Sequence, residues 1–287
     1  MKLSGFTFIR NGIKFSYPFQ ETLRTLLNLC DEVVIAVGKS EDGTLDAVKK
    51  LSTPKLKIIE TVWDSTLKGG KTLAAQTDIA LSHCTGDWCL YLQGDENIHE
   101  NDYVLLLRDI ARSDEQQSVE GVLLNYLHFY GNYTTLATGR KWYRHEIRVV
   151  RNNRNIVSWG DAQGFRKKIN SQRFEKIKCL QSQAKIYHYG WVRPPQEQDL
   201  KLYAFNRLYE ETPTHEWTFG NSPLFDISTF TGTHPMVMQE KIAHDARWAQ
   251  LFSAKLTPKP LLHKVSDWIE SLTGHRIGEY KNYQLKE

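Results

Sequence analysis

The sequence contains no apolar run that approaches the roughly 18 residues of a transmembrane helix. Residues 1–5 lead directly into an alternating, strand-like pattern and lack the apolar stretch of a signal peptide. Its four cysteines are scattered without a C-x-x-C pair, which argues against a zinc knuckle and against a disulfide scaffold. These absences favour a cytoplasmic protein in a reducing compartment.

A large excess of one charge is missing as well. The 287 residues include 37 Lys and Arg against 33 Asp and Glu, which gives a formal net charge of +4. This excess is too small to indicate a nucleic-acid partner, but it would suit an anionic small ligand or a membrane surface. No G-x-G-x-x-G follows a predicted strand, and Gly69–Thr72 lacks the earlier glycine of a P-loop, so neither of these phosphate-binding motifs is favoured.

What the sequence does contain is a regular alternation of strand and helix patterns. Apolar runs predict strands at 3–9, 33–37, 56–62 and 88–92. Helical spacing of apolar residues predicts helices at 17–29, 45–51, 71–83 and 103–110. Strands that alternate with helices indicate βαβ units and a mostly parallel sheet. Aromatic-rich patterns at 121–130 and 146–151 then indicate antiparallel strands, and a helical pattern returns at 261–272.

Polar residues directly follow the predicted strands, where ligands of open α/β sheets bind. Four such strand ends stand out: Arg10 and Asn11 after the first strand, Ser40, Glu41 and Asp42 after the second, Trp63 and Asp64 after the third, and Gln93, Asp95 and Glu96 after the fourth. Two adjacent carboxylates after a buried strand suit Mg²⁺ or Mn²⁺ that also contacts phosphates. The alternative is a polar loop that caps the next helix.

The order of these motifs resembles the family-two, GT-A-fold glycosyltransferases. The stretches that carry the resemblance are FIRNG, VGKSEDGTLDAVKK, GDWCLYLQGDEN and, later, YHYGWVR, and the similarity covers about residues 3–240. In that family a D-x-D-type motif closes the fourth strand, and an acidic turn after the second strand lies at the nucleoside. This chain departs from the pattern in having Gln93 at the first acidic position and Gly38 where relatives often carry an Asp.

The resemblance implies an α/β, GT-A-type nucleotide-diphospho-sugar-binding fold, with a mostly parallel central sheet flanked by helices. We expect the GT-A domain at 1–240, divided into a nucleotide-binding half (1–100) and an acceptor half (101–240). A C-terminal helical extension would follow at 241–287. Lys259, His263 and Lys264 lie beside the apolar stripe of this tail, which could rest on an anionic membrane or pack on the domain.

The resemblance also implies site residues. The metal ligands would be Asp95, Glu96 and His188. Asp95 stands at the position that meets the metal in the family, and the alternative for Glu96 is a residue that only structures the loop. His188 is included because a neutral imidazole is a common ligand for such ions. The nucleotide sugar would be bound by Arg10, Asn11, Glu41, Asp42, Gln76, Gln93 and Arg193. The alternatives are a core histidine at position 188 and a surface arginine at position 193.

An inverting sugar transfer needs a carboxylate that takes the proton of the acceptor hydroxyl. Asp161 is the only carboxylate between Glu146 and Glu175. In similar chains the acceptor-side base is usually found in this segment, so we predict Asp161 as the general base. The alternative is an aspartate that caps a turn or a helix.

The hypothesis from the sequence is an inverting, metal-dependent (Mn²⁺ or Mg²⁺) glycosyltransferase. It would move a sugar from a nucleoside diphosphate sugar to a hydroxyl of a glycan or lipid-linked acceptor. The resemblance implies a role in bacterial surface-polysaccharide or lipopolysaccharide synthesis, in the cytoplasm or at the inner face of the membrane. Two alternatives remain open: a sugar nucleotidyltransferase and a non-catalytic carbohydrate- or nucleotide-binding module.

Overall fold

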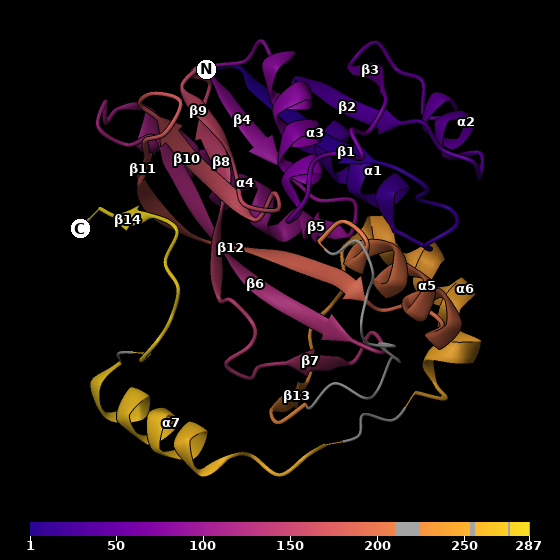
Figure 1. Ribbon diagram of the computed structural model, residues 1–287, viewed down its shortest axis with the longest axis vertical. Helices are drawn as coiled ribbons and strands as arrows, with labels where there is room; N and C mark the ends of the chain where they lie inside the picture. The colour runs from indigo at the N-terminus through magenta and orange to yellow at the C-terminus, as the bar shows by residue number, and fades with distance from the viewer. Residues whose placement is uncertain (210–223, 253–255, 275, 287) are drawn as a thin grey trace.

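The computed structural model describes the whole chain except residues 210–223, 253–255, 275 and 287 (Figure 1). Parts of the predicted acceptor half and of the predicted C-terminal extension therefore lie outside the described residues.

Strands β1 to β4 form a parallel block in the order β4-β1-β2-β3. Their bounds are Leu3–Ile9 (β1), Glu32–Gly38 (β2), Leu56–Thr61 (β3) and Trp88–Tyr91 (β4). The connecting helices are α1 (Phe19–Leu29), α2 (Thr44–Lys49) and α3 (Lys71–Ser82). This block confirms the predicted succession of strands and helices.

Helices α1 and α3 cover opposite faces of the parallel block. Val33, Ile35 and Val37 of β2 pack in one apolar cluster with α1, whereas Val34 and Ala36 pack in a second cluster with α3. Because successive side chains of a strand point to opposite faces, a strand covered on both sides must be apolar at every position. The uninterrupted apolar run of β2 reflects this double cover.

The second half of the sheet is mixed. Strand β8 (His145–Arg151) is antiparallel to β4 and to β6 (Gly121–Tyr130). The long strand β12 (Lys178–Trp191) is parallel to β6 and antiparallel to β5 (Glu96–Ile98). The other elements of this region are η1 (Glu100–Asp102), α4 (Tyr103–Asp114), the strand β7 (Thr135–Ala137) next to β6, and β13 (Ile227–Thr229) at the end of the sheet beyond β7. A separate small sheet contains β9 (Ile156–Trp159), β10 (Gly164–Lys168) and β11 (Phe174–Lys176).

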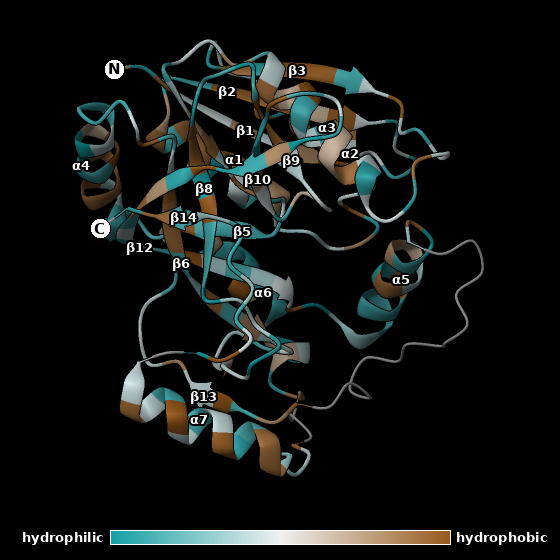
Figure 2. Cartoon of the chain, turned by 60° about the vertical axis from the view of Figure 1, so that its left-hand side comes forward, coloured by the Kyte–Doolittle hydropathy of each residue, from teal (hydrophilic) through white to brown (hydrophobic). Residues whose placement is uncertain are grey.

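In the described residues after β12, the helices are α5 (Pro195–Asn206), α6 (Gln239–Ala249) and α7 (Leu261–Thr273), and the 3₁₀ turn η2 (Met236–Met238) precedes α6. The chain then returns to the sheet through β14 (Gln284–Leu285), which pairs with β12. In Figure 2, α7 is banded brown and teal and lies at the end of the molecule away from β1–β3. Within the described residues, no helix combines the length and apolarity that a membrane span requires. The α/β fold with a helix-flanked, mostly parallel central sheet is the one predicted.

Candidate active site

A cavity of about 990 Å³ lies at the carboxyl ends of the parallel strands, and residues of α5 form another part of its wall. This is the edge at which open α/β sheets bind ligands. The sequence-predicted site residues that line it are Arg10, Asn11, Glu41, Gln93, Asp95, Asp161 and His188. The cavity lining does not include the other four, which are Asp42, Gln76, Glu96 and Arg193.

Asp95 is buried and lies next to two nitrogen atoms. Its Oδ1 is 4.0 Å from His188 Nε2, and its Oδ2 accepts a hydrogen bond of 3.3 Å from Lys201 Nζ. Burial alone would raise the pKa of Asp95, but the positive charge of Lys201 and the neighbouring His188 and Arg193 outweigh burial and lower it. The carboxylate is therefore ionised where the strand edge meets the cavity.

A chain of hydrogen bonds sets the proton positions of two histidines. His128 Nε2 is 2.7 Å from the carbonyl oxygen of Tyr143, and since a carbonyl only accepts, this nitrogen carries the proton. His128 Nδ1 then accepts from His188 Nδ1 at 2.9 Å. Burial lowers the pKa of His188 to about 4 and that of His128 to about 3, so both rings are neutral. His188 Nε2 consequently presents a lone pair toward Asp95.

Gly190 keeps the space beside this pair open. A Cβ at position 190 would collide with His188 Nε2 and would lie 2.9 Å from Asp95 Oδ2. Glycine is therefore the residue that lets β12 pass close to both atoms without filling the space next to them.

Lys201, on α5, is a site residue that the sequence analysis did not find. Its Nζ donates to Asp95 Oδ2 and, at 2.8 Å, to the carbonyl oxygen of Gly190. Burial, together with the charge of Arg193, lowers the pKa of Lys201 to about 7, although Asp95 acts in the opposite direction. The residues of α5 lack a clear apolar period, and Gln198 is its only buried residue, so the helix gave no pattern to detect. The Pro194–Pro195 pair at its start was the available signal, since proline suits the first helical turn.

Glu96 was predicted as a metal ligand, but the structure places it in the protein interior. Arg148 donates to both of its carboxylate oxygens at 2.8 Å, and Tyr126 Oη donates to Oε1 at 2.7 Å. Both side chains of the ion pair are fully buried. With its oxygens held in this way, Glu96 does not face the cavity.

Asp42 and Gln76 also hold protein groups together instead of lining the cavity. Asp42 accepts hydrogen bonds from the backbone N–H of Lys14 and from the N–H and hydroxyl of Thr44. Burial would raise the pKa of Asp42, but these hydrogen bonds outweigh it and lower the pKa. Gln76 is buried on α3 and accepts from the hydroxyl of Thr61 at 2.5 Å.

Arg193 is neither a surface residue nor part of the cavity lining. Its guanidinium donates to the carbonyl oxygens of Phe15 and Gly190 at 2.6 and 3.1 Å and lies 4.7 Å from the centroid of the Tyr17 ring. Its positive charge lowers the pKa of Asp95 and so helps to keep that carboxylate ionised.

Asp161 lies in the turn between β9 and β10 and lines the cavity. Its Oδ2 accepts a hydrogen bond of 2.5 Å from Tyr209 Oη. Two contacts fix the turn: Gln93 Nε2 donates to the carbonyl oxygen of Ala162 at 3.2 Å, and Arg148 donates to that of Gln163 at 2.6 Å. Gln93 thus connects the segment that carries Asp95 to the turn that carries Asp161.

Trp63 occupies the end of the cavity near β2. A Cβ at position 38 would collide with the indole nitrogen of Trp63, so Gly38 is what allows the ring to lie there. Arg10 lies over the same ring, with 5.4 Å between its guanidinium carbon and the ring centroid. Among the described residues, the buried indole nitrogen has no hydrogen-bond partner. The absence of a side chain at position 38 therefore lets an aromatic ring lie beside the end of β2.

The sequence model of glycosyl transferase family 2 matches residues 18–174. No curated protein matches the chain.

Several solved structures resemble the chain. S. aureus TarS 1–349 has 20% sequence identity and a TM-score of 0.35, with 53% of this chain and 47% of that chain covered. Mannosyltransferase PcManGT from Pyrobaculum calidifontis, in complex with GDP-Man and Mn²⁺, has 21% identity and a TM-score of 0.34, with 42% and 34% covered. Glucosyl-3-phosphoglycerate synthase from Mycobacterium tuberculosis, in complex with Mn²⁺, UDP and phosphoglyceric acid, has 13% identity and a TM-score of 0.30, with 45% of this chain and 43% of that chain covered. This chain thus spans less than half the length of each of these three structures.

Proposed function

Since the chain belongs to glycosyl transferase family 2, we propose that it moves a sugar from a nucleoside diphosphate sugar to a hydroxyl group, with inversion and with a divalent metal ion. One observation carries this proposal: a single cavity contains both kinds of group that the reaction needs. Asp95, His188 and Lys201 gather at one point, where a metal ion and a diphosphate would bind. Asp161 offers a carboxylate for the acceptor hydroxyl.

Asp95 and His188 fit a divalent cation. Asp95 Oδ1 and His188 Nε2 lie 4.0 Å apart, His188 Nε2 has a lone pair, and Gly190 leaves room beside both atoms. In the described part of the chain no group of three His, Cys, Asp or Glu side chains could hold a metal by itself. Mg²⁺ commonly binds through one or two protein ligands together with substrate phosphates, so this small set suits a donor-completed site. When bound, the ion would neutralise charge on the departing diphosphate.

Lys201 would contribute a second positive charge at the same place. Its ammonium contacts Asp95 and a backbone carbonyl and lines the cavity. A fixed cation near the diphosphate stabilises the negative charge that develops as the sugar leaves. Arg193, which does not line the cavity, would add positive charge near the diphosphate without touching the donor.

The nucleoside would bind at the end of the cavity formed by Arg10, Glu41 and Trp63. The indole ring offers a face for stacking of a nucleobase, and the Arg10 guanidinium lies beside it. Asn11 supports this end, because its side-chain oxygen accepts from the backbone N–H of Glu41 at 3.0 Å.

Asp161 would act as general base. The acceptor oxygen attacks the anomeric carbon while the bond from that carbon to the diphosphate oxygen breaks, and the hydroxyl proton passes to the Asp161 carboxylate. Tyr209, which donates to Asp161 Oδ2, would orient the carboxylate so that Oδ1 remains for the acceptor.

The acceptor would be a glycan or a lipid-linked glycan, in bacterial surface-polysaccharide or lipopolysaccharide synthesis at the cytoplasmic side of the membrane. These assignments follow from the resemblance of the motifs. The division into a nucleotide-binding half, an acceptor half and a C-terminal extension remains a prediction of the same kind.

The test is a panel of nucleoside diphosphate sugars incubated with the full chain, with and without Mn²⁺, with release of the nucleoside diphosphate as the readout. We expect slow donor hydrolysis that depends on the metal and is faster in the presence of an acceptor hydroxyl. Release of pyrophosphate would instead indicate a nucleotidyltransferase, and nucleotide binding without turnover would indicate a binding module.

Asp161→Asn tests the base in the same assay. The substitution should lower transfer to an acceptor by about 100- to 10,000-fold, because the amide cannot take the proton. Donor binding and its dependence on Mn²⁺ should stay near the wild-type values, since Asp161 is not placed at the metal. Near-normal transfer would remove Asp161 from the mechanism.

A further inference from the structure

Helix α7 exposes its apolar side. Leu262 and Trp268 are 80% and 64% exposed, Leu261, Val265 and Leu272 are exposed as well, and no residue of the helix is buried. An amphipathic helix that belongs to a core turns its apolar stripe inward. Here the stripe lies outward, and such a contiguous apolar surface marks a site of interaction.

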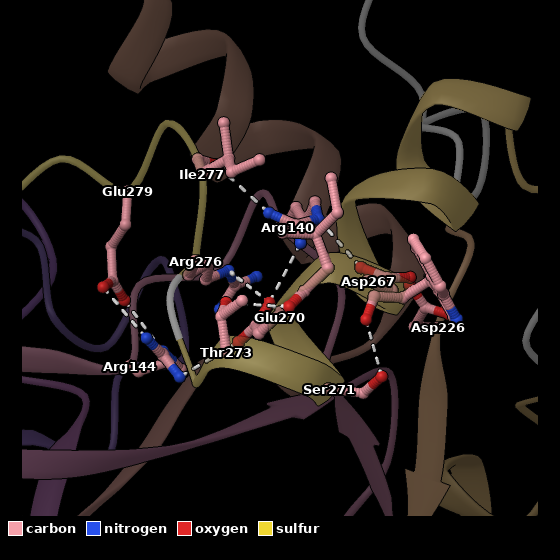
Figure 3. A network of polar contacts seen from close by, with 12 residues as sticks. Arg140, Arg144, Asp226, Asp267, Glu270, Ser271, Thr273, Arg276, Ile277 and Glu279 are labelled. Carbon is pink, nitrogen blue, oxygen red and sulfur yellow. Dashed lines mark hydrogen bonds and ion pairs between the residues drawn. The ribbon is translucent and has the colours of Figure 1, made fainter.

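The polar side of α7 is the side that attaches it to the rest of the protein (Figure 3). Arg140 donates to Asp267 at 2.8 Å and to Glu270 at 2.9 Å, and Arg144 donates to the other oxygen of Glu270 at 3.1 Å. Lys259, just before the helix, is paired with Asp226 and Asp267. These contacts hold the helix in an orientation in which its apolar side is exposed in the described structure.

The same contacts remove negative charge from the outer surface. Asp267 and Glu270 are the only carboxylates of α7, and arginines pair with both of them. The exposed side therefore carries apolar residues and the cation Lys264, with no acid among them. An exposed apolar stripe with a tryptophan and a neighbouring cation suits the interface of an anionic bilayer.

We infer that α7 docks the protein on an anionic membrane surface, with Leu262, Val265, Trp268 and Leu272 entering the interface. The ion pairs of Arg140 and Arg144 with α7 connect the exposed side of the helix to the cavity. Arg140 and Arg144 flank Lys141 and Tyr143, which line the cavity wall. Docking would thus hold part of the cavity wall near the membrane, and this step rests on the proposed function, because it would serve a lipid-linked acceptor.

The experiment is flotation of the full chain with vesicles of phosphatidylcholine, with and without phosphatidylglycerol. We expect binding to the vesicles that contain phosphatidylglycerol, and weaker binding at high salt. The double variant Leu262→Asp/Trp268→Asp should lower vesicle binding by at least about tenfold, because it places charge in the apolar stripe. Val104→Asp is the matched control, since Val104 is 79% exposed on α4 and should leave binding unchanged.

Three results would overturn the inference. They are absence of wild-type binding, equal binding by the double variant, and a dimer in solution that the double variant dissociates, which would assign the surface to a second copy of the chain. Hydrolysis of a soluble donor is measured on the same samples. If hydrolysis is present and vesicle binding absent, only the docking surface fails; if binding is present and hydrolysis absent, only the proposed activity fails.

Discussion

Asp95 and Glu96 are neighbours in sequence, yet they occupy opposite environments. Asp95 faces the cavity, with an imidazole and an ammonium beside it, whereas Glu96 lies in the interior between Arg148 and Tyr126. The difference follows from their places in the chain, since Asp95 lies in the turn that precedes β5 and Glu96 is the first residue of that strand. One carboxylate is thus available to a ligand, and the other fixes the scaffold behind it.

The interior carboxylate still affects the site, through Arg148. The guanidinium binds Glu96 on one side and the carbonyl oxygen of Gln163 on the other, two residues after Asp161. The pair Glu96–Arg148 therefore positions the turn that carries the proposed base. Asp95 is thus the carboxylate that can bind a ligand, and Glu96 is the one that supports the site from the interior.

Breaking the interior pair should have the largest effect on stability. Arg148→Met leaves the Glu96 carboxylate buried without its cation, and such a loss destabilises a protein by about 3–5 kcal/mol. Urea unfolding followed by circular dichroism measures the change. The double variant Glu96→Met/Arg148→Met should recover much of it, because no unpaired charge remains. A destabilisation below about 1 kcal/mol for Arg148→Met would contradict the role given to the pair.

Asp95→Asn should show the opposite balance. We expect a decrease in transfer of about 100- to 1,000-fold, because the residue that would bind the metal and organise the diphosphate charge is lost. The free energy of unfolding should change far less than in Arg148→Met, since Lys201 can keep its bond to the Gly190 carbonyl. Nucleotide binding, measured by calorimetry, should lose its dependence on Mn²⁺. Retained dependence would remove Asp95 from the metal site.

The sequence predicted the environment of Asp95 better than that of Glu96. The position of Asp95 after a buried strand was visible in the local pattern, and so were Arg10 and Glu41 after theirs. The partner of Glu96 lies 52 positions away on β8, and pairing over that distance depends on the strand order. The resemblance favoured Asp95 over Glu96 as the residue that meets the metal, but no local pattern shows that Glu96 turns to the interior.

The same limit explains the other differences. The parallel block was predictable because its apolar runs are continuous and its helices are amphipathic. Helix α5, which supplies Lys201, lacks such a period. Asp42 and Gln76 were predicted from their positions, but hydrogen bonds to Thr44 and Thr61 take up their side chains. Those contacts are visible only once the loops are placed in space.

A third prediction concerns the support behind the metal site. His128→Phe removes the nitrogen that accepts from His188 Nδ1, so the ring orientation and tautomer of His188 are no longer fixed. Loss of such a supporting contact typically lowers metal affinity by 10- to 100-fold. Mn²⁺ titration of nucleotide binding measures the effect. His83→Phe is the control, because His83 lies at the end of α3, outside the cavity lining. Equal Mn²⁺ affinity in His128→Phe and wild type would contradict the tautomer assignment.

The smallest expected effect is on the pH dependence of stability, and it concerns a third carboxylate, Glu146 of β8. Burial raises the pKa of Glu146 to about 7, although Arg148 and the hydrogen bond from Gln163 oppose the shift. The folded state therefore binds more protons than the unfolded chain between the ordinary pKa of 4.5 and about 7. The stability contributed by this proton is complete below pH 4.5 and is lost as the pH rises through 7.

This loss should appear as a decrease in the free energy of unfolding of up to about 1.4 kcal/mol per pH unit within that window. Glu146→Gln keeps an oxygen for Gln163 and carries no titrating group, so its slope should be smaller than that of the wild type. Urea unfolding at a series of pH values compares the two proteins. Parallel pH profiles would show that the pKa of Glu146 is not raised in the folded state. Glu146 would then be an ionised carboxylate like Asp95, and the proposed contrast between the two would be wrong.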